Sequence, residues 1–594
     1  MTKQKLELTW IGKEKRPQLE PRILLEDPAR SYHAKQRFSD ADIFDNRLIF
    51  GDNLLALKAL EQEFAGKVKC VYIDPPFNTK QAFEHYDDGY EHSIWLGLIR
   101  DRVEVIRRLM SDDGSLFVHI DDNELGYLIV LLDEIFGRSN RIGVVTFKQS
   151  SASGPKAINP GLVTTNNYLL YYAKNKSVWS PNRVFVPGQR DDRYSKCIEN
   201  FQDNFKDWRL IGLREAFLRN LKLESWDAVK AKYADKLEEK LSDFVVSNAY
   251  RVVRTARVAS KDVNESARDA LGKSNTDPSR VYCSPRDGKD DYYFLGGEQL
   301  VFYKSKTRVI DGVTSTASPL TNLWDDLLSN NLHNEGGVSF PNGKKPEALI
   351  KRCLELSTET GDIVLDSFGG SGTTGAVAHK MGRRWLMIEL GEHCHSHVIP
   401  RMHAIIDGND QSGISKTAGW KGGGGFRYYS LAPSLIVNDR WGNPVINPEY
   451  NPAQLSEALC KLEAFTYAPS ETHWWKHGHS SERDFIYVTT QNLSADQLQA
   501  LADEVGEEQG LLVCCAAYHG VTAAKASERW PNLTLKKIPK MVLSRCEWGH
   551  DDYSLNVANL PMAQETPEAE SETKAKKTKK AAAPQTGLFE GEDQ

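Results

Sequence analysis

The chain has 594 residues, too many for one hydrophobic core, so we expect roughly three or four domains. Its hydrophobic fraction of 40% and charged fraction of 26% are ordinary for a soluble globular protein, and the net charge of −6 neither supports nor excludes a polyanionic partner. No apolar run approaches the roughly 18 residues of a membrane helix, and residues 1–5 lack the apolar segment of a signal peptide. The nine cysteines form no CxxC pair, which favours reduced thiols in the cytoplasm over a disulfide framework.

Strands and helices alternate in the first part of the chain. Strands are expected at 47–53, 69–73 and 115–120, and helices at 95–109 and 125–136, the last ending at Gly137. The second strand runs directly into Asp74. This alternation predicts a parallel α/β sheet with helices on both faces.

The pattern changes over about 180–320, where charge is dense and the helical stretches are polar. Residues 292–310 have the pattern of a hairpin around Gly296-Gly297. We interpret this region as an inserted domain. The α/β pattern resumes afterwards, with a helix at 346–357, a strand at 363–365, a helix from Thr373 and a strand at 384–388.

Four consecutive glycines, 422–425, are typical of a linker or an exposed loop. A second, smaller α/β unit follows, with strands at 485–489, 511–517 and 533–538 and a capping box at 494–497 that opens a helix. After about Met562 the sequence has almost nothing to bury, so we expect it to be disordered.

The run Asp74-Pro75-Pro76-Phe77 is suited to binding an exocyclic amine of adenine or cytosine. Such an amine is a weak nucleophile, and methylating it requires fixed acceptors that take up the developing positive charge. The Asp74 side chain and the Pro75 carbonyl are candidate acceptors, the prolines fix the backbone, and Phe77 offers a face on which a flipped base can stack. The alternative is an ordinary turn at the end of a strand.

A glycine-rich turn between a strand and a helix is the second candidate site. Its expected cofactor-binding residues are Asp366, Phe368, Gly369, Gly370, Gly372 and Thr373, with Glu389 at the end of the next strand. Glycines allow close approach of the backbone to a ligand, and an acidic side chain can bind ribose hydroxyls. A dinucleotide fold is the alternative, but the GxGxxG spacing is missing, and so is the lysine of a P-loop.

With these motifs in this order, the chain resembles adenine-N6/cytosine-N4 DNA methyltransferases of the permuted (beta) class, and most resembles the modification subunits of type III restriction–modification systems. Residues 51–54, 114–124 and 340–346 match further segments of that family, and Asp52 falls in its cofactor loop. Asp74 favours adenine, since cytosine-N4 enzymes more often carry serine there. Phe77 replaces the commoner tyrosine and Ser367 the usual proline.

The resemblance implies a Rossmann-like methyltransferase sheet with S-adenosyl-L-methionine as cofactor and double-stranded DNA as substrate. It also implies a homodimer and a separate helicase–nuclease restriction subunit. The expected domains are an N-terminal extension (1–45), a catalytic half (46–180), a target-recognition insert (181–320), a cofactor-binding half (321–430), a C-terminal α/β domain (431–562) and a disordered tail (563–594).

Three other readings stay open. One is the same fold acting on cytosine N4, and another is methylation of RNA or of a protein glutamine. The third is a DNA-specificity subunit without activity of its own. The absence of a Pro-Cys motif argues against cytosine-C5 chemistry.

Weaker patterns lie outside the two motifs. Arg251, Arg254 and Arg257 are three apart, which fits one helix face that either contacts DNA or is simply solvated. Residues 292–294 are better explained as core than as base contacts. His393 and His397 are four apart near Cys394, but no CxxC partner exists and we expect no metal site. In the tail, Gln585, Leu588 and Phe589 resemble peptides that dock bacterial sliding clamps.

Overall fold

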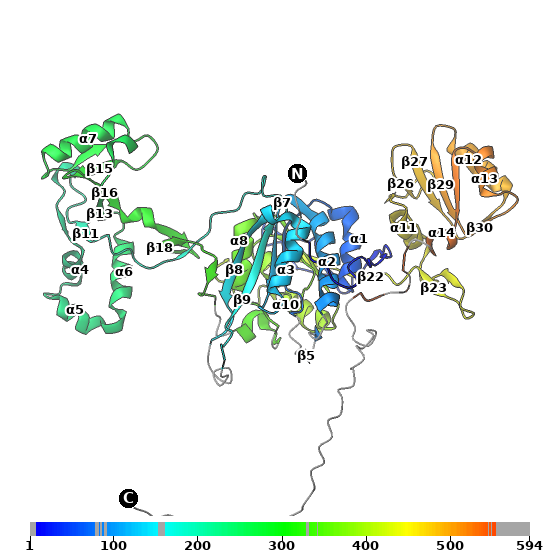
Figure 1. The fold of residues 1–594 in the computed structure, drawn as a ribbon, viewed down its shortest axis with the longest axis horizontal. Helices are drawn as coiled ribbons and strands as arrows, with labels where there is room; N and C mark the ends of the chain where they lie inside the picture. The colour runs from blue at the N-terminus through cyan, green and yellow to red at the C-terminus, as the bar shows by residue number, and fades with distance from the viewer. Residues whose placement is uncertain are drawn as a thin grey trace, which may run out of the picture. The chain divides into compact units, whose positions relative to one another are not determined.

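The computed structural model describes residues 7–77, 82–83, 86–87, 92–151, 161–327, 332–340, 343–543, 546–547, 549 and 551–553 (Figure 1). Outside these ranges lie Pro341 of the segment 340–346 and the tail expected at 563–594, which includes Gln585, Leu588 and Phe589. Among the described residues, no helix has the length and apolar character needed to cross a membrane.

The largest sheet has eleven strands and contains both sequence motifs at its strand ends. In pairing order its strands are β1 (Leu24–Glu26), β22 (Gly425–Leu431), β3 (Asn46–Phe50), β21 (Arg384–Glu389), β20 (Ile363–Asp366), β4 (Val68–Ile73), β7 (Met110–Ile120), β9 (Asn166–Ala173), β8 (Arg141–Lys148) and β19 (Leu323–Trp324), with β2 (Tyr32–His33) also paired to β22. The N-terminal residues expected as a separate extension thus supply strands β1 and β2.

Six neighbouring strands, from β22 to β7, are parallel to one another, as the alternation of strands and helices predicts. Beyond β7 the prediction of a parallel sheet is wrong, because β9 pairs antiparallel with both β7 and β8. Strands β8 and β9 are consecutive among the described strands and neighbours in the sheet, and antiparallel pairing is common for strands related in this way.

Helices pack against the central sheet in two groups. The first consists of α1 (Asn53–Phe64), α2 (His92–Leu109) and α3 (Leu125–Leu132), of which α2 contacts both of the others. The second consists of α8 (Glu347–Ser357), α9 (Thr373–Lys380) and α10 (Ile399–Ile406), which share a buried core with Cys70 and Tyr72 of β4. Alternate residues of a strand point to opposite faces, so Val71 and Ile73, also buried, face the other way.

The insert contains two antiparallel sheets and its own cores. The smaller sheet pairs β10 (Phe185–Pro187), β18 (Val313–Pro319) and β17 (Thr307–Ile310), and the larger pairs β12 (Leu210–Gly212), β11 (Lys196–Ile198), β13 (Val252–Ala256), β16 (Glu298–Phe302), β15 (Tyr292–Leu295) and β14 (Tyr282–Ser284). Its helices are α4 (Leu213–Leu221), α5 (Trp226–Tyr233), α6 (Leu237–Ser247) and α7 (Glu265–Thr276).

The hairpin expected at 292–310 is present only as far as Phe302. Its turn residues Gly296 and Gly297 both have positive φ, the backbone that a tight hairpin turn requires. The remaining strand, β17, pairs with β18 instead.

The C-terminal α/β unit is built on a five-stranded sheet. Its strands are β25 (Thr466–Tyr467), β26 (Gly478–His479), β27 (Asp484–Val488), β29 (Gly510–Cys515) and β31 (Leu533–Lys537), and its helices are α11 (Pro452–Leu462), α12 (Ala495–Val505), α13 (Ala523–Arg529) and α14 (Lys540–Leu543). The predicted capping box is present: the Ser494 side chain accepts from the Gln497 backbone, and the Gln497 side chain accepts from that of Ser494.

The glycine run at 422–425 is not the linker or exposed loop expected from the sequence. All four glycines are buried, and Gly425 begins β22. A Cβ atom on Gly424 would lie 2.7 Å from the carbonyl oxygen of Ile43. The glycines therefore serve close packing of backbone against backbone, a use that the same residues permit as readily as flexibility.

We predict that Gly424→Ala destabilises the protein by more than the cost of its left-handed backbone alone. Gly361→Ala is the control, because Gly361 also has positive φ but nothing lies within 4 Å of its added Cβ. Backbone strain should cost each variant about 1 kcal/mol, and the clash should cost Gly424→Ala about 1–3 kcal/mol more. Thermal unfolding of the two variants measures the difference, and equal losses would contradict close packing at Gly424.

Candidate active site

The two sequence motifs meet at one edge of the central sheet. Strands β4 and β20 pair in parallel, with Leu365 opposite Val71, so their carboxyl ends lie side by side. The turn at 74–77 follows β4 directly, and the glycine turn at 368–372 follows β20. Ligands of open α/β sheets bind at this edge, so the pairing forms one candidate site from two distant segments.

The Asp74 carboxylate is the polar centre of the first motif. Its Oδ2 lies 2.8 Å from Lys345 Nζ, and its Oδ1 lies 3.5 Å from His119 Nδ1. The side chain keeps 19% of its surface exposed, so it can be reached from outside the protein. The Phe77 ring lies 5.2 Å from the His119 ring, between centroids, and the Lys345 ammonium lies 4.9 Å from the Phe77 centroid.

The backbone of this turn is held by the helix beside it. The indole nitrogen of Trp95, a fully buried residue of α2, donates to the carbonyl of Pro76 at 2.8 Å. The two prolines fix φ, so the carboxylate and the aromatic ring are presented by a turn with little freedom. An acceptor held in this way need not be ordered again when a substrate binds.

His119 was not expected as a site residue, although it lies in the predicted strand at 115–120. It is fully buried, and its ring contacts the Tyr72 hydroxyl at 3.1 Å and the Asn167 side-chain nitrogen at 3.0 Å. Burial, with a smaller contribution from the positive charge of Lys345, lowers the pKa of His119 well below its ordinary value. The imidazole beside Asp74 is therefore neutral at neutral pH.

The glycine turn is closed by hydrogen bonds to two buried carboxylates. Asp366 accepts from the Phe368 backbone at 2.9 Å and from the Thr374 hydroxyl at 2.5 Å. Glu389, at the end of β21, accepts from the Gly370 backbone at 2.6 Å. Gly370 has positive φ, which only glycine adopts without strain.

Glu389 is also held from its other side. Its Oε1 accepts from the Gly391 backbone at 2.8 Å and lies 3.1 Å from His393 Nε2. Asp52 is fully buried and caps α1 by accepting from the backbones of Leu54 and Leu55. Its other oxygen pairs with Arg102 at 3.3 Å, so the contact of Asp52 with a cofactor stays a prediction.

A cluster of buried charges supports the glycine turn from behind. Arg401 donates to the Ser371 carbonyl at 3.1 Å, to the Thr373 hydroxyl at 2.9 Å and to Glu347 at 2.8 Å. Lys380 pairs with the same Glu347 carboxylate at 2.8 Å and with Asp410 at 2.7 Å. These side chains come from distant segments, so no spacing in the sequence indicates them.

The expected DNA-contacting arginines do not share a helix face. Arg254 lies within strand β13, while Arg251 and Arg257 flank it. Because side chains of a strand alternate, residues three apart point to opposite faces. Arg254 lies over the Tyr194 ring, whereas Arg257 is 95% exposed. The helix prediction is wrong here.

The aromatic run at 292–294 is divided between the two faces of its sheet. Phe294 is fully buried in the core of the insert, as expected. Tyr293 points the other way and packs against Trp208, with 4.9 Å between ring centroids. The prediction that residues 292–294 belong to the core is therefore confirmed in full only for Phe294.

The histidines at 393–397 are engaged by neighbouring side chains. His393 contacts Glu389, and His395 lies 3.0 Å from Glu392 and 2.8 Å from the Tyr428 hydroxyl. Within the part of the chain that the structure describes, no group of three or more His, Cys, Asp or Glu side chains could hold a metal ion.

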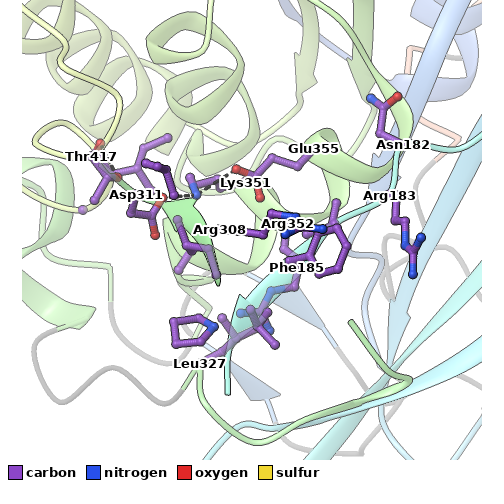
Figure 2. A pocket seen from close by; sticks show the side chains of 18 of the residues that line it. Asn182, Arg183, Phe185, Arg308, Asp311, Leu327, Lys351, Arg352, Glu355 and Thr417 are labelled. Atoms are coloured by element: carbon purple, nitrogen blue, oxygen red, sulfur yellow. Dashed lines mark hydrogen bonds and ion pairs between the residues drawn. The ribbon is translucent and has the colours of Figure 1, made fainter. Parts of the chain in front are cut away.

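A cavity of about 550 Å³ lies between α8 and the smaller sheet of the insert (Figure 2). Its basic side chains are already engaged. Arg183 and Arg308 lie 5.1 and 5.3 Å from the Phe185 ring centroid, and Lys351 pairs with Asp311 at 2.7 Å. The residues that line it belong to neither motif, so we assign it no ligand.

A carboxylate–aromatic turn and a glycine turn at neighbouring strand ends define an α/β protein of the methyltransferase class. A family model described as DNA methylase, for N6 and N4 methyltransferases, matches residues 68–399. The chain belongs to this family.

Its relatives include modification subunits of type III restriction–modification enzymes. The HindVI Mod subunit of Haemophilus influenzae, described as probable, is 35% identical over 432 residues, which cover 67% of this chain and 55% of that protein. The EcoP15I Mod subunit of Escherichia coli is 23% identical, with 90% of each chain covered. Among solved structures, the cytosine-N4-specific PvuII DNA methyltransferase matches with a TM-score of 0.32 and 14% identity, covering 63% of this chain and 91% of that one.

The buried carboxyl of Asp366 should make stability depend on pH. Burial raises its pKa from 3.8 to about 8, with further contributions from the charges of Asp74 and Glu389, despite the opposing hydrogen bonds. The folded state thus keeps a proton that the unfolded state loses. The resulting stability is fully present below pH 3.8 and is lost as pH rises through about 8.

We therefore expect the thermal midpoint to fall more steeply between pH 6 and about 8 in the native protein than in Asp366→Asn, which cannot titrate. Asp362→Asn, one residue before the start of β20, serves as the control and should keep the native slope. Equal slopes for Asp366→Asn and the native protein would show that Asp366 does not hold this proton.

Proposed function

We propose that the protein is a site-specific DNA methyltransferase that transfers a methyl group from S-adenosyl-L-methionine to N6 of adenine in double-stranded DNA. One observation supports this above all: β4 and β20 pair in parallel, so the turn that carries Asp74 and Phe77 and the glycine turn follow neighbouring strands at one edge of the sheet. The DNA methylase family and the relatives, which are modification subunits of type III restriction–modification enzymes, support DNA as the substrate.

Asp74 would accept a hydrogen bond from the amine of the target base. This interaction draws the nitrogen lone pair out of the ring and stabilises the positive charge that develops on N6. The Pro75 carbonyl, on the same rigid turn, is the second proposed acceptor. The neutral His119 beside Asp74 adds no positive charge that would oppose this step.

Phe77 would hold the base once it has left the duplex. An amine inside a base pair cannot be reached, so the base must be flipped out at a cost of a few kcal/mol. Stacking of the flipped base on the Phe77 ring offsets part of this cost. Removal of the N6 proton needs only an acceptor such as Asp74, so no covalent link to the enzyme is required.

The residues of the glycine turn fit a nucleoside-bearing cofactor. Gly370 and Gly372 have positive φ, a backbone conformation that glycine adopts without strain, and Glu389 follows at the next strand end. When bound, S-adenosyl-L-methionine supplies a methyl group on a positively charged sulfur. Gly369, Gly370, Gly372 and Glu389 would hold it, with Asp366 and Thr373 shaping the turn.

We also propose several partners. A restriction subunit with helicase and nuclease activity would pair with this chain, as the type III names of the relatives suggest. Homodimerisation and a sliding-clamp contact through Gln585, Leu588 and Phe589 are further proposals, as is a location in the cytoplasm.

Methylation of cytosine N4 remains the alternative chemistry. Identifying the modified base in digested DNA distinguishes adenine N6 from cytosine N4 methylation.

The first test removes the acceptor. Asp74→Ala should lower kcat by about 100-fold or more, the usual cost of losing a fixed group that stabilises transition-state charge. The control is Asp113→Asn, which alters a carboxylate paired with Lys69 at 2.5 Å at the opposite end of β4 and should keep its activity. Methylome sequencing first identifies the recognition site. Transfer of labelled methyl groups to host DNA then measures kcat for both variants. Undiminished methylation by Asp74→Ala would refute the mechanism.

The second test loosens the glycine turn. Arg401→Met removes the bonds to Ser371 and Thr373, and we expect the dissociation constant for S-adenosyl-L-methionine to rise by about tenfold. Arg383→Met is the matched control, because this half-buried arginine donates to the backbone carbonyls of Met381 and Thr358 and belongs to neither motif. Calorimetric titration measures both, and equal affinities would show that Arg401 does not position the turn.

A further inference from the structure

We propose that Lys345 is an internal occupant of the target-base site, which takes the place of the base amine until DNA arrives. This inference rests on the proposed function, since it assumes that a flipped base binds between Asp74 and Phe77. It adds a positioning residue that also controls access to the site.

The ammonium of Lys345 lies where both recognition groups for the base converge. It is 2.8 Å from Asp74 Oδ2, the distance of a charge-assisted hydrogen bond, and 4.9 Å from the centroid of the Phe77 ring. The lysine side chain is only 11% exposed, so this is a packed position and not an excursion into solvent. The amine of an adenine stacked on Phe77 would also place a nitrogen over the ring and bind it to the Asp74 carboxylate.

The backbone of Lys345 is held on both sides. The preceding Lys344 donates through its ammonium to the Val338 carbonyl at 2.7 Å. Pro346 is the N-cap of α8, and the following Glu347 is fully buried in the charge cluster behind the glycine turn. The side chain of Lys345 can therefore leave the site without movement of α8, which begins two residues later.

A base and this ammonium cannot occupy the site together. A stacked base would have its ring atoms about 3.5–4.0 Å from the aromatic face. Its amine would lie at Asp74, where the Lys345 nitrogen now lies 2.8 Å from Oδ2 and 4.9 Å from the Phe77 centroid. A base amine must also take over the Asp74 oxygen that the ammonium now holds. A neutral amine is the weaker partner for a carboxylate, so a base alone competes poorly with the lysine.

DNA carries negatively charged phosphates, which a free base lacks. The strand that carries the flipped base brings phosphates to the same place, and these offer the displaced ammonium a new ionic partner. Lys345 would thus leave Asp74 for the backbone of the substrate when the base enters. The site would then open to a nucleotide within DNA and stay closed to free adenine compounds.

The test measures binding of 9-ethyladenine, which has no phosphate, to the full-length protein saturated with S-adenosylhomocysteine. We expect Lys345→Ala to lower its dissociation constant by about tenfold, the effect of losing one charge-assisted hydrogen bond of a competitor. Lys345→Arg keeps a cation that pairs with Asp74 and should bind 9-ethyladenine no better than the native protein. Lys69→Ala, which removes the lysine of the Lys69–Asp113 pair, is the control and should bind as the native protein does.

Two results would overturn the proposal. One is native or weaker binding of 9-ethyladenine by Lys345→Ala. The other is equal improvement in Lys345→Arg, since a retained cation should still block the site. Weaker binding of S-adenosylhomocysteine by Lys345→Ala, with binding of the base unchanged, would assign the lysine to the cofactor instead. Failure of the native protein to methylate any DNA would refute the proposed function separately, because this binding test needs no turnover.

Discussion

The parallel pairing of β4 with β20 is the contact on which the candidate site depends. The two strands come from segments separated by the whole insert, and their register sets how far each motif projects beyond the sheet edge. This pairing also brings the Asp74 carboxylate near Asp366. Burial raises the pKa of Asp366, the charges of Asp74 and Glu389 add to this shift, and the cation of Lys345 pairs with Asp74.

The charge cluster behind the glycine turn holds that turn in one conformation. A turn rich in glycine has many accessible conformations, and fixing it costs conformational entropy. Arg401 offers bonds to two positions of the turn and is itself held by Glu347, which Lys380 also pairs with. Buried charges are costly to remove from water, and removing one partner leaves the others uncompensated, so the cluster tolerates few alternative arrangements.

The sequence was sufficient for the features that depend on neighbouring residues. Strand β4, the turn after it, the glycine turn and α9 are each specified within a few positions, and their places in the fold are as expected. His119 and Lys345 lie in segments that match the family, 114–124 and 340–346, but only tertiary packing brings these two residues and Arg401 to the site. Two of the wrong predictions share a cause, because each pattern is compatible with two structures. Arginines three apart occur on a helix face and also along a strand, as at Arg251–Arg257. A glycine run occurs in loops and also where backbones pack closely, as at 422–425.

The way the insert begins and ends has a consequence for how such a protein can change. Its first strand, β10, pairs directly with its last long strand, β18, so that Phe185 lies opposite Pro319. The chain between them is a closed loop whose ends are already fixed, and lengthening such a loop costs little additional entropy. Residues 188–312 can therefore be exchanged, shortened or extended as a cassette while the strands of the central sheet keep their register. In evolution, this cassette can change without rebuilding the site at β4 and β20.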